Sequence, residues 1–520
     1  MKQTFFYGKD HLTVHTALQL AAGTIAGVLH PSVIQKVEES AAHVRTMTEE
    51  GKTVYGVTTG FGILANKKIS EADTALLQYK ILQSHSVGVG EPIPTEIAKL
   101  MLITKVHALA QGFSGIQLET LQRIIWHIDE DIIPVVPEKG SVGASGDLAP
   151  LAHLFLPLIG LGEVYAEGKR VHTTEILEKA GRSPVSLGPK EGLALINGTQ
   201  FILAFAIKAV ARLHNCLEAA DIIGAMSLES LTGTKAPFDE RLHGLRPYSG
   251  NKLVAQRLRL LLADSEIMES HMDCGRVQDP YSLRCMPQVH GATRTAWLHL
   301  KQLTEIEANS VTDNPVVFGS DDTVSGGNFH GQPLALPLDY AAFAASEIGN
   351  ISDRRCYLLL EGKWGLPMLL MNNVGLNSGF MIPQYTTAAL VTENKTLCFP
   401  ASADSIPTSL GQEDHVSMGS ISGRKLNTIL DNLEFILAIE LLSACQAIEF
   451  RRPHKSSEVL EFAHDLVREL VSFAEEDRIF SDDINKITRI IRDCSFVSRV
   501  GVFAGDRRLN LNEGYEEFSL

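Results

Sequence analysis

One long apolar segment constrains the fold of this chain more than any other feature. Residues 201–231 are apolar on nearly every side of a helical projection. A helix without a polar face has to be buried among other helices. Lys208 and Arg212 interrupt the apolar run far short of the width of a bilayer, so it is not expected to span a membrane. The segment therefore predicts a mainly α protein with a long-helix bundle at its centre.

Further helical patterns accompany this segment, and a short β-hairpin is expected between them. The helical patterns cover residues 291–311, 338–361, 385–395, 424–449, 459–474 and 483–493. The hairpin is expected to pair residues 316–318 with 323–325. The first 200 residues are more mixed, with glycine-rich loops between helices. No linker rich in Pro, Ser or Gly is seen, so we expect one catalytic unit with an N-terminal region (1–200) and a helical region (201–520).

Composition narrows the class of protein. The chain is 45% hydrophobic and 21% charged, which is typical of a globular protein in water. A net charge of −15 without a basic cluster argues against a nucleic-acid-binding surface. The 7 cysteines are scattered singly, as in reduced proteins, and the N-terminus has no apolar signal core. We therefore expect a cytoplasmic protein with neither nucleic acid nor membrane as a partner.

Residues 140–154, GSVGASGDLAPLAHL, contain an unusual concentration of small side chains. A loop that enters a helix explains Asp147, as the N-cap, and Pro150, in the first turn. It does not explain the small residues that precede them. The segment resembles the prosthetic-group motif of the aromatic amino acid ammonia-lyases, whose Ala-Ser-Gly tripeptide cyclises to 4-methylidene-imidazol-5-one (MIO). By this resemblance, Ala144, Ser145 and Gly146 form the MIO group of this chain.

The residue types of this tripeptide suit the cyclisation. Gly146 offers an unhindered backbone nitrogen that can approach the carbonyl carbon of Ala144. Ser145 carries a hydroxyl that can leave and create the methylidene group. A helix that begins near Asp147 would place its positive end close to negative charge developing on the ring.

The resemblance covers most of the chain and implies the helical fold of the ammonia-lyases, which is similar to that of fumarase and aspartase. Its other motifs are YGVTTGFG (55–62), VQDPYSLRC (277–285), TDNP (312–315), GGNFH (326–330), GLNSGFM (375–381) and QEDHVSM (412–418). Their order and spacing are similar to those of the histidine-specific bacterial members. Two positions depart from the pattern: Thr58 replaces the usual Asn, and Met286 replaces a common Gln. Both neighbour predicted catalytic residues, so they bear on rate and fine selectivity.

The resemblance assigns roles to individual residues. Tyr55 is the base that removes the β-proton, which requires nearby positive charge or dipoles to lower its pKa. Arg284 binds the substrate carboxylate through two parallel hydrogen bonds. Asn197 is a hydrogen-bonding partner near MIO and the substrate amine. Tyr281 belongs to the catalytic set, and the residues that shape the pocket are Gln278, Tyr281, Asn314 and Phe329. Simple core packing explains Phe329 almost as well.

Substrate selection is expected to rest on four further residues. Ser84 and His85 are similar to the ring-recognition pair of the histidine-specific enzymes, although a histidine can also face a phenol. Glu413 discriminates better, because a carboxylate accepts a hydrogen bond from an imidazole but would be buried unpaired against a phenyl ring. Met381 would pack against the ring.

The expected activity is the elimination of ammonia from L-histidine to give trans-urocanate, with MIO and without metal or pyridoxal phosphate. The resemblance also implies a homotetramer whose active sites share residues between subunits. A tyrosine ammonia-lyase or aminomutase with the same chemistry is the alternative within the class. The fumarase and argininosuccinate lyase group is a second class, but its G-S-S-x-M-P-x-K-x-N-P loop is missing here. A helical scaffold without activity is the third alternative, and the intact tripeptide, Tyr55 and Arg284 argue against it.

Overall fold

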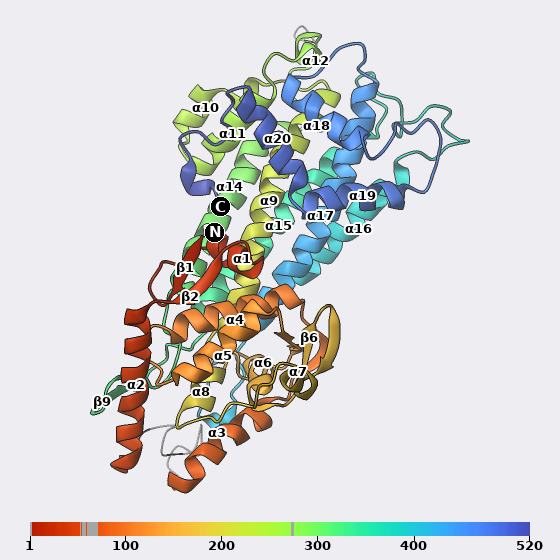
Figure 1. Ribbon diagram of the computed structural model, residues 1–520. Helices are drawn as coiled ribbons and strands as arrows, with labels where there is room; N and C mark the ends of the chain where they lie inside the picture. Colours follow the sequence, from red (N-terminus) through yellow and green to blue (C-terminus); the bar gives the residue numbers. More distant parts are fainter. Residues whose placement is uncertain (1–2, 53, 55–58, 60–70, 272–274) are drawn as a thin grey trace. The chain divides into compact units, whose positions relative to one another are not determined.

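The computed structural model describes the whole chain except residues 1–2, 53, 55–58, 60–70 and 272–274 (Figure 1). It is mainly α, as the helical patterns predict. Contacts between Cα atoms divide it into two compact units. Unit 1 comprises Met1–Lys208, Leu300–Asp339 and Pro400–Arg424, and unit 2 comprises Ala209–His299, Tyr340–Phe399 and Lys425–Leu520. The grouping of catalytic residues into regions 1–200 and 201–520 stays a prediction.

Unit 1 combines helices with several small sheets. Its helices are α1 (Val14–Ala21), α2 (Pro31–Glu49), α3 (Glu71–His85), α4 (Thr95–Leu109), α5 (Leu118–Asp129), α6 (Leu148–Phe155), α7 (Thr173–Lys179) and α8 (Glu191–Ile196). Its strands are β1 (Thr4–Tyr7), β2 (Ala26–Leu29), β3 (Val89–Pro92), β4 (Ile133–Pro134), β5 (Pro137–Lys139), β6 (Glu163–Ala166), β7 (Lys169–His172), β8 (Val316–Gly319) and β9 (Asp322–Val324). β1 and β2 pair in parallel, whereas β3–β5, β4–β6–β7 and β8–β9 are antiparallel. The β8–β9 pair confirms the predicted hairpin.

The longest helices contribute residues to both units. They are α9 (Gln200–Ser230), α14 (Met286–Ala308), α15 (Gln332–Leu359) and α17 (Gly419–Glu449). From Phe201 to Ser230, every residue of α9 is buried except the half-buried Lys208, Ala211, Arg212 and His214. The prediction of a helix without a solvent face is therefore confirmed.

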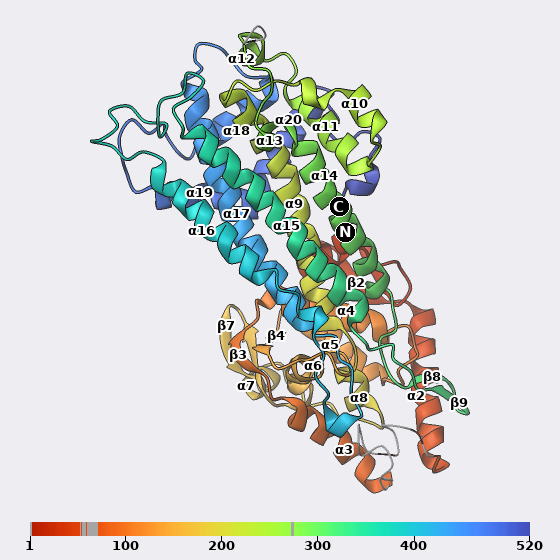
Figure 2. The same ribbon diagram turned by 180° about the vertical axis from the view of Figure 1, so that it is seen from behind.

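In unit 2, polar contacts join the long helices, which run side by side in both views (Figures 1 and 2). Arg355 of α15 donates to Glu440 of α17 at 2.5 Å, and Ser227 of α9 donates to the same carboxylate at 2.7 Å. The shorter helices of unit 2 are α10 (Glu240–Leu245), α11 (Ser249–Leu261), α12 (Glu266–Glu269), α13 (Tyr281–Arg284), α16 (Met381–Leu397), α18 (Glu458–Arg468), α19 (Phe480–Arg492) and α20 (Ser495–Asp506).

Several predicted boundaries are wrong by five or six residues: the structure begins α14 at Met286, α15 at Gln332 and α17 at Gly419, before the predicted starts at 291, 338 and 424. One predicted helix end is also wrong. The apolar pattern extends the helix to residue 474, but α18 ends at Arg468. Val471 and Ala474 are still buried, so the apolar pattern continues beyond the helix. The main-chain nitrogen of Ala474 donates to the side chain of Gln446 at 3.0 Å, a distant contact that replaces a helical hydrogen bond.

No helix among the described residues is both long enough and apolar enough for a membrane crossing.

Candidate functional site

The predicted MIO tripeptide lies in unit 1, in the loop between β5 and α6. The main-chain nitrogen of Gly198 donates to the oxygen of Ser145 at 3.3 Å, and the nitrogen of Asp147 donates to the oxygen of Gly198 at 2.8 Å. Gly146 has a φ of +76°, and a Cβ there would overlap the Gly198 carbonyl group. Only glycine allows this close approach between the tripeptide and the chain segment that leads into α9.

Asp147 precedes α6 as predicted, but its side chain does not cap that helix. Its carboxylate instead accepts from the main-chain nitrogen of Ile202, in the first turn of α9, at 3.0 Å and from the Ser141 hydroxyl at 3.1 Å. The side chain is fully buried, and this burial raises the pKa of Asp147 to about 7. Asp147 therefore ties the tripeptide loop to the start of α9.

A cavity of about 220 Å³ opens beside the tripeptide. Five of the predicted site residues line it: Ser84, His85, Ala144, Gly146 and Glu413. The lining is completed by Thr408, Val87, residues 140–142 of the tripeptide loop, and Leu148 and Ala149 of α6. Drug-sized ligands occupy pockets of roughly 300–1,000 Å³, so this volume suits a smaller molecule such as an amino acid.

Glu413 connects the substrate-recognition residues with the tripeptide. Its carboxylate accepts from the Ser145 hydroxyl at 3.4 Å through one oxygen and from the Thr408 hydroxyl at 2.9 Å through the other. Ser84 and His85 contact each other, with 3.0 Å between the hydroxyl oxygen and Nδ1. Burial lowers the pKa of His85, although Glu413 partly opposes this shift. A neutral imidazole and a carboxylate thus line one cavity, a combination that can recognise both donors and acceptors on a ligand.

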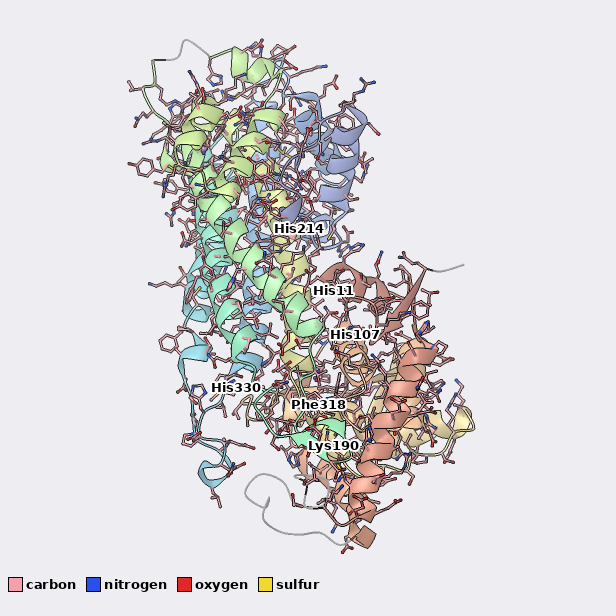
Figure 3. All side chains as sticks on the ribbon, turned by 90° about the vertical axis from the view of Figure 1, so that its left-hand side faces the viewer. His11, His107, Lys190, His214, Phe318 and His330 are labelled. Atoms are coloured by element: carbon pink, nitrogen blue, oxygen red, sulfur yellow. The ribbon has the colours of Figure 1, made fainter. Side chains whose placement is uncertain are left out.

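Asn197 and Asn314 lie behind the tripeptide in a buried polar network. The side-chain nitrogen of Asn197 donates to the main-chain oxygen of Asn314 at 2.8 Å and to Asp313 at 3.4 Å. Asp313 also accepts from Lys190 (labelled in Figure 3) at 2.5 Å. The main-chain oxygen of Asn197 accepts from the Lys105 amine at 2.5 Å. Since Gly198 follows Asn197 directly, this network holds the segment that contacts the tripeptide.

Four predicted site residues belong to unit 2. Tyr281 and Arg284 lie in α13, and the Arg284 guanidinium carbon is 4.5 Å from the centre of the Tyr281 ring. Arg284 donates through Nε to the main-chain oxygen of Asp279 at 3.1 Å, and among the described residues its guanidinium makes no ion pair. Gln278 is exposed, and Met381 is the half-buried first residue of α16.

Two further predicted site residues are Tyr55 and Phe329. Tyr55, the predicted base, lies outside the described residues, as does Thr58. Phe329 is half-buried in unit 1. The neighbouring His330 (Figure 3) stacks on His415, with 5.4 Å between ring centroids.

Sequence patterns missed Thr408 and Lys105. Thr408 holds Glu413, and Lys105 holds Asn197. The available signal for Lys105 was its position in the apolar segment 97–109, where a lysine is out of place on a buried helix. Thr408 gave no comparable signal, because a threonine in a loop is ordinary.

The described residues fit an MIO group at positions 144–146. Gly146 can approach other backbone atoms closely, and the Ser145 carbonyl already has a donor in Gly198. The side-chain oxygen of Asn197 is buried and has no hydrogen-bond partner among the described residues. A buried acceptor of this kind indicates a missing donor.

Known proteins are similar to this chain along nearly its whole length. The chain is 45% identical over 493 residues to the histidine ammonia-lyase of Pseudoalteromonas atlantica, covering 94% of this chain and 97% of the relative. The histidine ammonia-lyase structure from Trypanosoma cruzi matches with a TM-score of 0.89 and 40% identity, over 98% of this chain and 97% of that one. The tyrosine aminomutase of Streptomyces globisporus matches with a TM-score of 0.92 and 32% identity, over 98% and 100% of the two chains. The family model for aromatic amino acid lyases matches residues 12–469, and the chain belongs to this family.

Proposed function

We propose that this protein eliminates ammonia from L-histidine to give trans-urocanate, using an MIO group formed from Ala144, Ser145 and Gly146. The observation that carries the proposal is the cavity in unit 1. His85 and Glu413 line it together with Ala144 and Gly146, and Glu413 reaches the Ser145 hydroxyl at 3.4 Å.

The chemistry of this lining favours an imidazole over a phenyl or phenol ring. The Glu413 carboxylate can accept a hydrogen bond from an imidazole N–H, and Thr408 already fixes its other oxygen. A phenyl ring would cover the other carboxylate oxygen without offering it a donor, which is costly. Curated relatives at about 46% identity are named histidine ammonia-lyases, in line with this preference.

The remaining roles are those that the family resemblance implies, and the chemistry of the residues supports them. The MIO group supplies an electron-poor double bond that turns the substrate amine into a better leaving group. Arg284 binds the substrate carboxylate, a role that fits a guanidinium without an ion pair among the described residues. Asn197 accepts from the substrate amine through its unpartnered side-chain oxygen. Tyr55 removes the β-proton, and Gln278, Tyr281, Asn314, Phe329 and Met381 shape the pocket around the substrate.

We further propose a homotetramer with active sites shared between subunits. Tyr281, a predicted site residue, is 71% exposed in the single chain, and the apolar side chains of Leu376 and Leu410 are 86% and 89% exposed. A neighbouring copy of the chain would bury such residues. Light scattering coupled to size-exclusion chromatography tests the four-subunit assembly. The cytoplasmic location expected from the scattered cysteines remains a prediction.

The activity is tested by offering L-histidine, L-tyrosine and L-phenylalanine separately to the purified protein, without added cofactor. We expect ultraviolet absorbance of urocanate to rise only with histidine. The structural similarity to a tyrosine aminomutase makes β-tyrosine formation the second outcome to measure. Product from tyrosine and none from histidine would overturn the substrate assignment and leave the MIO chemistry in place.

A further inference from the structure

Lys105 is a buried cation that the proposed reaction does not use. It lies on α4 in unit 1, with only 2% of its surface exposed. In the described part of the chain its amine has one hydrogen-bond partner, the main-chain oxygen of Asn197 at 2.5 Å. Burying a charged amine against a carbonyl group is expensive, so the contact needs a functional or structural reason.

The peptide group that Lys105 contacts is the one that reaches the tripeptide. Its oxygen belongs to Asn197, and its N–H belongs to Gly198. That N–H donates to the carbonyl oxygen of Ser145 at 3.3 Å. A cation at one end of a peptide group polarises the group and strengthens the hydrogen bond at its other end. The Lys105 amine is thus linked through one peptide group to the middle residue of the tripeptide.

The Ser145 carbonyl oxygen is the one that survives cyclisation. The Gly146 nitrogen bonds to the Ala144 carbonyl carbon, whose oxygen leaves as water. Ser145 then loses its hydroxyl group and its Cα hydrogen as a second water. The new double bond is conjugated with the Ser145 carbonyl group, so electron density from an attacking nucleophile moves toward that oxygen.

Burial and the neighbouring charges determine how readily the Lys105 amine is protonated. Burial lowers the pKa of Lys105 to about 7, with Asp313 and Asp147 opposing the shift and Lys190 adding to it. Asp313 is hydrogen-bonded to Lys190 at 2.5 Å, whereas no ion pair of Lys105 occurs among the described residues. The protonated amine therefore directs its charge at the Asn197 carbonyl group, and no direct carboxylate contact among the described residues neutralises it.

We propose that Lys105 is a positioning residue that makes the tripeptide electrophile more reactive, by fixing the Asn197–Gly198 peptide group and polarising its N–H toward the Ser145 carbonyl oxygen. This inference rests on the proposed MIO function. It assigns to Lys105 no contact with the substrate and no proton transfer. The charge acts through Gly198 on the oxygen where negative charge collects.

The test compares Lys105→Met, which removes the charge, with Lys105→Gln, which keeps a donor for Asn197. Lys99→Met on the same helix α4 is the matched control, since Lys99 pairs with the exposed Asp131 at 2.7 Å. Intact mass gives the fraction of chains that have lost two waters. The rate at which cyanide adds to these dehydrated chains, also followed by mass, measures electrophilicity without any substrate.

We expect cyanide addition to slow by about 10-fold or more in Lys105→Met and Lys105→Gln, with kcat for histidine falling and KM nearly unchanged. Lys99→Met should match the wild type. If Lys105→Met does not fold, Lys105→Gln alone decides. Dehydrated Lys105→Gln chains that add cyanide at the wild-type rate would overturn the proposal. Wild-type protein without the loss of two waters would instead refute the proposed function itself.

Discussion

Two buried polar clusters, one in each unit, differ in how their charges are paired. In unit 2, Glu218 and Asp221 of α9 face Arg257 and Arg294, and all four carboxylate oxygens accept a hydrogen bond or form an ion pair at 2.6–2.9 Å. Burial opposes ionisation of Asp221, but Arg294, His290 and Arg257 outweigh it and hold its pKa well below the usual range. This cluster joins α9 to α11 and α14.

In unit 1 the pairing is incomplete. Lys190 and Asp313 form an ion pair, but Lys105 faces a carbonyl group, and the side-chain oxygen of Asn197 has no partner among the described residues. In unit 2 each buried carboxylate has a cationic partner, although Arg294 Nε and His290 Nε2 have no hydrogen-bond partner among the described residues. In unit 1 the buried Lys105 amine has no such counter-charge in direct contact, which is costly. The difference between the two units is therefore a buried amine without a counter-charge, placed against the segment that contacts the tripeptide, compared with a cluster whose charges are compensated.

The largest expected effect is a loss of turnover in unit 1 without a matching loss of stability. Ser145→Ala removes the hydroxyl that must leave, so histidine turnover should fall by at least about 1,000-fold. The melting temperature should stay within about 1 °C of the wild type, because the loss is one hydrogen bond of 3.4 Å at a cavity wall. Urocanate absorbance, intact mass and thermal melting provide the measurements. Ser310→Ala, at a half-buried serine two residues beyond α14 whose hydroxyl also makes one hydrogen bond, is the control, and a fully active Ser145→Ala would exclude MIO.

In unit 2, we expect a substitution to lower stability and to leave the formation of the tripeptide's MIO group unchanged. Asp221→Asn leaves Arg257 and Arg294 to share the single carboxylate of Glu218 and removes the carboxylate that pairs with His290, which should lower the free energy of unfolding by about 3–5 kcal/mol. The fraction of chains that have lost two waters should not change. Thermal melting and intact mass measure the two properties in one preparation. Asp482→Asn, on the exposed side of α19, is the control. Loss of dehydration at unchanged stability would show that the unit 2 cluster serves the site.

Glu413→Gln should alter substrate use with little change in stability. Glutamine still accepts from Thr408, but it binds an imidazole less strongly than a carboxylate does, so kcat/KM for histidine should fall by about 10- to 100-fold. The ratio of tyrosine to histidine turnover should rise. Steady-state kinetics with both substrates measure this, and Asp414→Asn is the neighbouring control. Unchanged histidine kinetics would remove the main argument for selectivity.

Periodicity and motifs could predict the bundle and the main components of the site. The apolar segment 201–231 predicts α9 because a helix with apolar residues on every side has to be buried on every side. The hairpin 316–325 and the tripeptide 144–146 are each formed by residues that are adjacent in the chain, so a local sequence pattern can reveal them. Glu413 was found through its motif, and the structure places it on the same cavity as His85.

The contacts that sequence patterns could not predict join distant parts of the chain. Lys105 and Asn197 are 92 positions apart, and the Asp147 side chain bonds Ile202, 55 positions away, in place of its own helix. Capping rules consider only the next few residues, so they placed Asp147 correctly at the start of α6 and wrongly assigned its hydrogen bond. Tertiary packing decides such contacts, and no local pattern encodes them.

The smallest expected effect concerns the pH dependence of stability. Burial raises the pKa of Asp147 from its ordinary value of 3.8 to about 7. Between these values the unfolded chain has released this proton and the folded chain has kept it. Stability should therefore fall as pH rises through that window. Asp147→Asn does not titrate, so its melting temperature should change less between about pH 4 and pH 7 than that of the wild type.

Glu229 offers the matched variant in unit 2, because burial also raises its pKa to about 7. Glu229→Gln should flatten the same pH window without changing the fraction of dehydrated chains. Asp147→Asn should also lower that fraction, since Asp147 directly follows Gly146 and ties the loop to Ile202. Melting curves across the window, paired with intact mass, follow both effects. If the two variants lower dehydration equally, then a buried carboxyl group affects the tripeptide through general stability, and the contrast between the clusters does not hold.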